Sequence, residues 1–177
     1  MKKYLLVLAV IAASAHGFEL QGYKSLSFGA SIDQLRSLGF KCDKGERVYC
    51  QGGKDTLFGK ESSVSAWARP DSGVTKIDVS IMGMSGTDLV RAYTEALGAP
   101  RAYVHPNMFH QRIEASYWVS ADGTAIVVKR NLDEGETRRL PGFGTEVRLS
   151  SATYLDKRET ESLLTEAQKY APKPRDY

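Results

Sequence analysis

Two stretches in the middle of the chain alternate between apolar and polar residues, which is the period-two pattern of a half-buried β-strand. They cover residues 63–68 and 76–81. The segment between them contains Pro70-Asp71-Ser72-Gly73, which has the composition of a tight turn. The pattern therefore predicts a β-hairpin with one buried face.

A second pair of strands is predicted further along the chain. Residues 113–119 and 124–130 flank Ala121-Asp122-Gly123, and Asp-Gly is a strong signal for a hairpin turn. Residues 146–154 predict one more strand, and the charged, Gly- and Pro-containing link at 131–144 predicts a long exposed loop.

Three segments have the spacing of amphipathic helices. Ser31 and Gln34 form a capping box, and apolar residues then recur at helical spacing within 32–38, which predicts a short helix. Residues 88–97 predict a second helix behind a serine or threonine cap, and residues 156–170 predict a third, mostly polar helix.

The order of these elements favours an α+β fold, with an antiparallel sheet and helices packed on one face. At 177 residues and 42% hydrophobic residues, the chain is long enough for one domain, expected over residues 16–170. The pattern Gly-x-Ser-x-x-x-Leu occurs at Gly29 and again at Gly83. It is compatible with a weak tandem repeat, although a common helix-capping solution explains it equally well.

The first residues predict an exported protein. Residues 1–15 have a basic start, an apolar middle and an Ala-Ser-Ala end, as in a secretory signal peptide. We therefore expect a periplasmic or secreted bacterial protein, with no membrane span, that begins near His16 and ends in a flexible tail at 171–177. Removal of the leader leaves a formal charge of about +1, so the charge indicates no nucleic-acid partner.

Cys42 and Cys50 are the two cysteines of the chain. An oxidising compartment favours a disulfide between them, and Lys44-Gly45 suits the turn of the hairpin that the disulfide would close. A redox dithiol and a metal site are less compatible with this spacing.

The segment 101–112 is the first candidate binding surface. Its candidate contact residues combine aromatic and basic side chains, a composition enriched in protein interfaces: Tyr103, His105, Phe109, His110 and Arg112. A second interpretation is that Tyr103 and Phe109 fold back over an edge of the sheet. Trp67 and Trp118 are further candidates, because the strand patterns place them opposite apolar faces, where they could form an exposed aromatic patch.

Catalytic chemistry has weaker signals. The segment around Ser85 fails the Gly-x-Ser-x-Gly pattern of a hydrolase at Thr87, and Ser85 suits a helix cap better. His105, His110 and Glu114 are the one group that could bind a metal, but their spacing is wrong for a helical motif. We therefore expect no catalytic residue, metal or cofactor.

Residues 23–50 combine apolar residues, a Phe-Gly pair, a capping serine and two cysteines: Tyr23, Leu26, Phe28-Gly29, Ser31, Leu35, Cys42 and Cys50. It resembles the entry segment of the secreted β-lactamase inhibitory protein family and, more loosely, of small outer-membrane-assembly lipoproteins. The resemblance implies a compact, non-enzymatic α+β domain whose sheet presents aromatic residues to a protein partner. The unit at Gly83 lacks the phenylalanine and cysteines of a tandem inhibitor, and no lipoprotein cysteine is present.

Three hypotheses for the function follow. The first is an exported, non-enzymatic module that binds a protein, as an inhibitor or a cell-envelope accessory factor. The second is a small hydrolase or metal-dependent enzyme that uses His105, His110 and Glu114. The third is a structural envelope or phage-associated protein.

Overall fold

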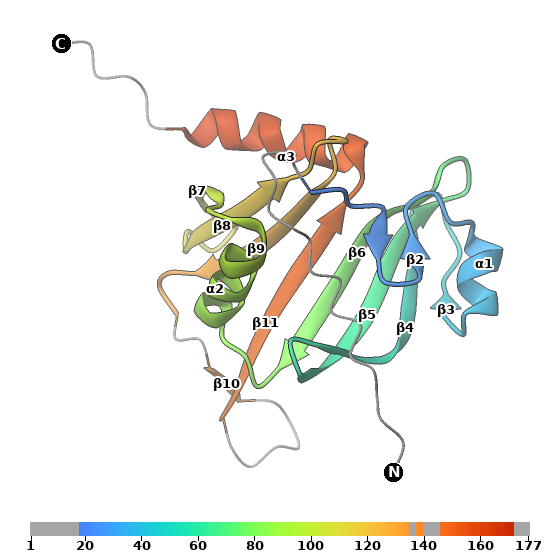
Figure 1. Ribbon diagram of the computed structural model, residues 1–177, viewed down its shortest axis with the longest axis horizontal. Helices are drawn as coiled ribbons and strands as arrows, with labels where there is room; N and C mark the ends of the chain where they lie inside the picture. Colours follow the sequence, from blue (N-terminus) through green and yellow to red (C-terminus); the bar gives the residue numbers. More distant parts are fainter. Residues whose placement is uncertain (1–17, 135–136, 140–145, 172–177) are drawn as a thin grey trace.

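The computed structural model describes residues 18–134, 137–139 and 146–171. The predicted signal peptide at 1–15 and residues 172–177 of the predicted tail lie outside the described residues. Within the described part, the chain has an α+β fold with an antiparallel sheet and three helices (Figure 1). One disulfide is present there. No helix there is long and apolar enough to cross a membrane.

The main sheet of the described residues has the strand order β3-β4-β5-β6-β11-β9-β8-β7, and β10 pairs with β11 beside this path. A small separate ribbon consists of β1 and β2. The strands are β1 (Gly22–Tyr23), β2 (Leu26–Ser27), β3 (Lys41–Cys42), β4 (Val48–Leu57), β5 (Lys60–Arg69), β6 (Gly73–Met82), β7 (Arg101–Pro106), β8 (Arg112–Val119), β9 (Ala125–Asn131), β10 (Thr137–Arg139) and β11 (Glu146–Leu155).

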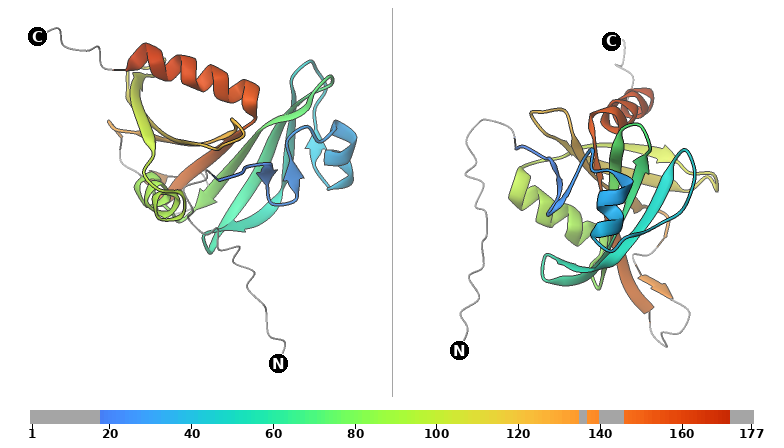
Figure 2. Two further views of the ribbon diagram at one scale, coloured as in Figure 1. Left: turned by 45° about the horizontal axis from the view of Figure 1, so that its top comes forward. Right: turned by 90° about the vertical axis from the view of Figure 1, so that its right-hand side faces the viewer.

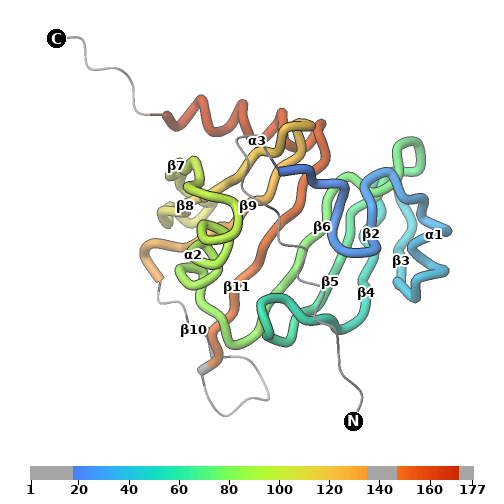
Figure 3. The backbone as a smooth tube through the Cα atoms, in the orientation of Figure 1, coloured from blue at the N-terminus to red at the C-terminus, as the bar shows by residue number. Residues whose placement is uncertain are grey.

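The strands do not follow one another in sequence across the whole sheet, because the chain moves once from the middle of the sheet to its far edge. After β6, helix α2 (Gly86–Leu97) takes the chain to the far edge at β7, and the chain returns through β8 and β9 to β11, which pairs with β6 (Figure 3). The hairpins predicted at 63–81 and 113–130 are confirmed as β5–β6 and β8–β9. β7 and β10 are the main differences, because both lie in segments expected to be connections.

Each predicted helix is present and begins behind an oxygen-bearing cap. In α1 (Ile32–Ser37), the Ser31 side chain accepts the backbone N–H of Gln34 at 3.2 Å, and the Gln34 side chain accepts the N–H of Ser31. The Ser85 side chain accepts the N–H of Asp88 and caps α2, and the Asp156 side chain accepts the N–H of Glu159 and caps α3 (Lys157–Tyr170). Both members of the repeated Gly-x-Ser pattern therefore supply a helix cap.

The helices do not all lie on one face, which corrects the expectation from the sequence. Leu35 of α1 and Leu89 of α2 belong to a hydrophobic cluster on one side of the sheet. Leu163 of α3 belongs to a second cluster on the other side (Figure 2, left). The physical reason is that the central strands have apolar residues on both faces: in β9, Ile126 packs in the first cluster and Val127 in the second.

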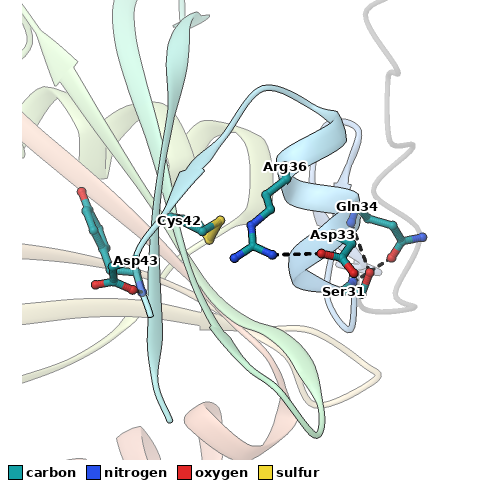
Figure 4. Close-up of a disulfide and its surroundings, with 8 residues drawn as sticks. Ser31, Asp33, Gln34, Arg36, Cys42 and Asp43 are labelled. Carbon is teal, nitrogen blue, oxygen red and sulfur yellow. Dashed lines mark hydrogen bonds and ion pairs between the residues drawn. A yellow bond between two sulfur atoms is a disulfide. The ribbon is translucent and has the colours of Figure 1, made fainter. Parts of the chain in front are cut away.

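The predicted disulfide joins Cys42 and Cys50. The two residues are directly opposite in the β3–β4 pair, with their Cα atoms 4.0 Å apart. The disulfide therefore fixes the β3–β4 end of the sheet, which lies beside α1. Arg36 of α1 donates to Asp33 at 3.0 Å and extends from the helix towards the strand that contains Cys42 (Figure 4).

Candidate functional site

The turn between β7 and β8, residues 107–111, presents the two most exposed large apolar side chains of the described part of the chain. We call it the hairpin tip. The exposed fraction is 85% for Met108 and 73% for Phe109. Apolar side chains of this size are normally buried, so two in succession at the end of a hairpin need an explanation.

The side chain of Asn107 fixes the shape of the hairpin tip. Its Oδ1 accepts the backbone N–H groups of Phe109 at 2.9 Å and of Gln111 at 3.0 Å. Its Nδ2 donates to the side-chain oxygen of Gln111 at 2.8 Å. His110 has a φ of 61°, a left-handed conformation that costs energy in a residue with a β-carbon. These hydrogen bonds hold the backbone in that conformation while Met108 and Phe109 point outwards.

The base of the hairpin tip is tied to the end of β9. Asn131 donates to Gln111 at 3.1 Å. Asp133 accepts both the backbone N–H of Arg112, at 2.6 Å, and its guanidinium, at 2.8 Å. The hydrogen bonds from Arg112 hold the pKa of Asp133 below its ordinary value. Arg112, a predicted contact residue, therefore positions the tip as well as lying on the surface.

Tyr103 and His105 lie away from the hairpin tip, in the contact with α3, so the two sequence-based alternatives for Tyr103 and Phe109 each hold for one residue at most. Tyr103 is buried, stacks on Tyr170 of α3 and donates its hydroxyl to Glu166 at 3.0 Å. Burial and this hydrogen bond raise the pKa of the Tyr103 hydroxyl. His105 packs beside Tyr103, with its Nδ1 3.8 Å from Glu166. Of the two aromatic anchors of this segment, Tyr103 thus belongs to the core and Phe109 to the surface.

Trp118 is not exposed, contrary to the sequence-based hypothesis. It lies in the first hydrophobic cluster with an exposed fraction of 4%, and its Nε1 donates to the carbonyl oxygen of Gly98 at 2.8 Å. The apolar side chains of β8 lie on both faces, so an opposite-face argument does not place its tryptophan in solvent. Tyr93 of α2 packs against the Trp118 ring.

Trp67 lies on the opposite face of the sheet and is half-buried. Its ring packs on Tyr49 of the neighbouring strand, and the side chains of Arg47 and Lys76 lie over it. Its Nε1 donates to Asp78 at 3.1 Å. Because Trp67 and Trp118 lie on opposite faces of the sheet and Trp118 is buried, the two tryptophans do not form one patch.

A groove of about 310 Å³ lies between α3 and this face of the sheet. Its charged groups include Arg47, Glu159 and Glu166. Arg47 pairs with Glu159 at 3.3 Å, and Glu166 accepts the Tyr103 hydroxyl. These polar groups connect α3 to the strands, so the groove is better explained as part of the helix contact than as a ligand site.

The residues proposed for an enzyme are not brought together. His105 and Glu114 lie on adjacent strands but point to opposite faces, because His105 pairs with Ile113 and Glu114 with Val104. His110 lies in the hairpin tip. Glu114 instead accepts the guanidinium of Arg130 at 2.7 Å. Across the described ranges, no group of three or more potential metal ligands is found.

Comparisons with protein-family models, curated proteins and solved structures find no significant match for this chain.

Four residues of the site were not among the sequence-based candidates: Asn107, Gln111, Asn131 and Asp133. Asparagine is itself a turn signal, because its side-chain oxygen can accept the backbone N–H of the residue two positions later. Asn107 has this position relative to Phe109. The contribution of Asn131 had no local signal, since it is 20 residues away from its partner Gln111.

Proposed function

We propose that this protein is an exported, non-enzymatic binding module that recognises a protein partner through its hairpin tip. The observation that supports the proposal best is the combination of exposure and order at Met108 and Phe109. Both side chains are exposed to solvent, while hydrogen bonds to Asn107 hold the backbone of the turn. Preorganisation of this kind lowers the entropic cost of binding.

The types of side chain also favour a protein partner. Methionine and phenylalanine are enriched at the centres of protein interfaces, where they enter apolar pockets. Arg112, His110 and Glu134 are exposed polar residues in or beside the hairpin tip, and protein interfaces have a polar rim of this kind. An inhibitor or an envelope accessory factor would use such a tip. The Cys42–Cys50 disulfide is compatible with an exported protein.

Catalysis is a weaker proposal because His105 and Glu114 point to opposite faces of the sheet. A role as a structural envelope or phage-associated component would use a large self-association surface, whereas the exposed apolar side chains of the tip form a small one.

A photo-crosslinking experiment tests the proposal. The photoreactive residue benzoylphenylalanine replaces Phe109 in one variant and Leu38 in a control variant. Leu38 is also apolar and is 52% exposed, but it lies beside α1. Mature protein is incubated with envelope extract of the producing cell and irradiated. We expect a discrete crosslinked protein from position 109 and none from position 38.

Affinity measurements then quantify the contact. For a true hot spot, Phe109→Ala should weaken binding of the crosslinked partner by about 2 kcal/mol, roughly thirtyfold. Leu38→Ala should have no effect. Equal crosslinking at the two positions, or unchanged affinity of a Met108→Ala, Phe109→Ala double variant, would contradict the proposal. Binding of the wild type to phospholipid vesicles that the double variant loses would instead identify a lipid surface as the target.

A further inference from the structure

The sheet ends in two very different edges. At one end, β3 is two residues long and lies beside α1. At the other end, β7 is six residues long, and its register with β8 has no bulge. No other strand in the described part of the chain pairs with β7. A long, regular, unpaired edge is a template for another strand.

One hydrogen bond shows which backbone groups of β7 are free. The carbonyl of Arg112, the partner of Pro106, faces β9 and accepts the N–H of Leu132 at 2.8 Å, so Pro106 and Arg112 form a non-hydrogen-bonded pair. Hydrogen-bonded and non-hydrogen-bonded pairs alternate along an antiparallel ladder. Ala102, Val104 and Pro106 are therefore in non-hydrogen-bonded pairs with β8 and direct their backbone groups away from it.

The side chains along this edge agree with that assignment. Proline is tolerated in a sheet where its missing N–H would face the outside, and Pro106 has such a position. Ala102 is exposed, and Val104 is 44% exposed. Helix α3 packs on the face of β7 through Tyr103 and Tyr170, so it leaves the edge open.

We propose that two copies of this chain associate by antiparallel pairing of their β7 strands, with the two-fold axis at Val104. In this register, Val104 of one copy and Val104 of the other exchange two N–H···O bonds. Ala102 in each copy donates to the carbonyl of Pro106 in the other. That carbonyl already contacts its neighbour His105 Nδ1 at 3.1 Å, and its second lone pair accepts the new bond.

The occupant is a second copy because the strand is complementary to itself in this register. On one face, Val104 lies opposite Val104 and Ala102 opposite Pro106. On the other face, Tyr103 lies opposite His105, and Arg101 lies opposite Asn107. No like charges are directly opposed. Pairing centred on Tyr103 would place Arg101 opposite His105, so the register at Val104 is favoured.

This inference goes beyond the proposed function and does not depend on it. The two-fold axis would point the two hairpin tips in opposite directions along the paired strands. Each dimer would then present two copies of the tip, and a target with two sites could bind with avidity.

Sedimentation equilibrium of the mature, oxidised protein between micromolar and hundred-micromolar concentrations tests the dimer. We expect a concentration-dependent dimer, and Val104→Lys should weaken it more than tenfold, because two lysines would face each other across the axis. Leu38→Lys is the matched control, since it adds the same charge to an exposed apolar position directly after α1. Circular dichroism checks that both variants fold.

A mixing experiment identifies the contact. Val104→Lys and Val104→Glu proteins should each be monomeric, and an equimolar mixture should restore the dimer, because opposite charges then face each other. In the wild type, amide exchange at Ala102 and Val104 should slow as concentration rises, while exchange at Tyr103, which already pairs with β8, should not change. A wild type that stays monomeric, or a dimer that Val104→Lys leaves intact, would overturn the proposal. Failure of the mixture to dimerise would do the same. None of these outcomes bears on crosslinking at Phe109, so the two proposals can fail separately.

Discussion

The Oδ1 atom of Asn107 lies 2.9 Å from the backbone nitrogen of Phe109, so one side chain determines how another is presented to solvent. The same oxygen also accepts the N–H of Gln111. Asn107, which is itself partly buried, therefore keeps the backbone of the hairpin tip ordered.

Replacement of Asn107 by Ala should make the backbone of the tip less ordered, although the exposed residues Met108 and Phe109 are themselves unchanged. A net hydrogen-bond free energy of about 1 kcal/mol corresponds to roughly a fivefold to tenfold change in the equilibrium constant for local opening of the turn. Amide exchange at Phe109 and Gln111 should therefore accelerate by about that factor. Ser72→Ala, which removes a hydrogen bond from another exposed turn, is the control. Unchanged exchange in Asn107→Ala would show that the turn is ordered by other contacts.

Tyr103→Ala and Phe109→Ala should have opposite consequences, although both remove an aromatic side chain from the same hairpin. Tyr103 is buried against α3, so its truncation should cost about 3 to 5 kcal/mol of unfolding free energy. Phe109→Ala should change it by less than about 0.5 kcal/mol. Thermal and urea unfolding distinguish the two. A large loss for Phe109→Ala would place its ring in the core.

The two tryptophans should differ in their access to a soluble quencher. With Trp118→Phe, the fluorescence comes from half-buried Trp67; with Trp67→Phe, it comes from Trp118, which is 4% exposed. Acrylamide should quench the first variant several times more strongly than the second. Similar quenching constants would contradict the burial of Trp118 beneath α2.

Reduction of the disulfide should destabilise the protein moderately. A loop of about nine residues corresponds to about 2 to 3 kcal/mol of chain entropy in the unfolded state. A Cys42→Ser, Cys50→Ser variant should therefore melt several degrees below the wild type. Mass spectrometry after thiol labelling of denatured, unreduced wild-type protein should detect no labelled cysteine, and two labels would disprove the bridge.

Acidification should loosen the base of the hairpin tip. The pKa of Asp133 is lower in the folded chain than in the unfolded chain, because Arg112 hydrogen-bonds to the ionised form. Its contribution to folding is therefore complete above the ordinary carboxyl pKa, about 3.9, and is lost as pH decreases through the lowered folded value. The backbone amide resonance of Arg112 should shift in that acidic range. Asp133→Asn should abolish the shift, whereas Asp71→Asn, in a different turn, should preserve it.

Local patterns were sufficient to predict most of the elements. The capping box at Ser31 and the Asp-Gly turn before β9 each depend on a few neighbouring residues, and both are confirmed. β7 was harder to predict because its exposed positions also carry apolar residues. Ala102 and Val104 are exposed, so the sequence does not alternate between polar and apolar residues although the burial does.

The placement of α3 had a signal that was available in the sequence. Ile126, Val127 and Val128 follow one another without a polar residue, which indicates a strand covered on both faces. The candidate site was less predictable. Phe109 was identified from composition, but its separation from Tyr103 depends on where the strand ends and the turn begins.

Helix α3 follows all the described strands in sequence, and this order has a consequence for synthesis. The second face of β7, β8 and β9 needs Leu163 and Ala167 to cover it, and the ribosome adds these residues after the strands. Until they emerge, the sheet has one covered side and one open apolar side, a form that favours aggregation. A shortened chain that stops before α3 would therefore aggregate rather than form a smaller stable domain, and a chaperone that binds open apolar surfaces would have its greatest effect before α3 emerges.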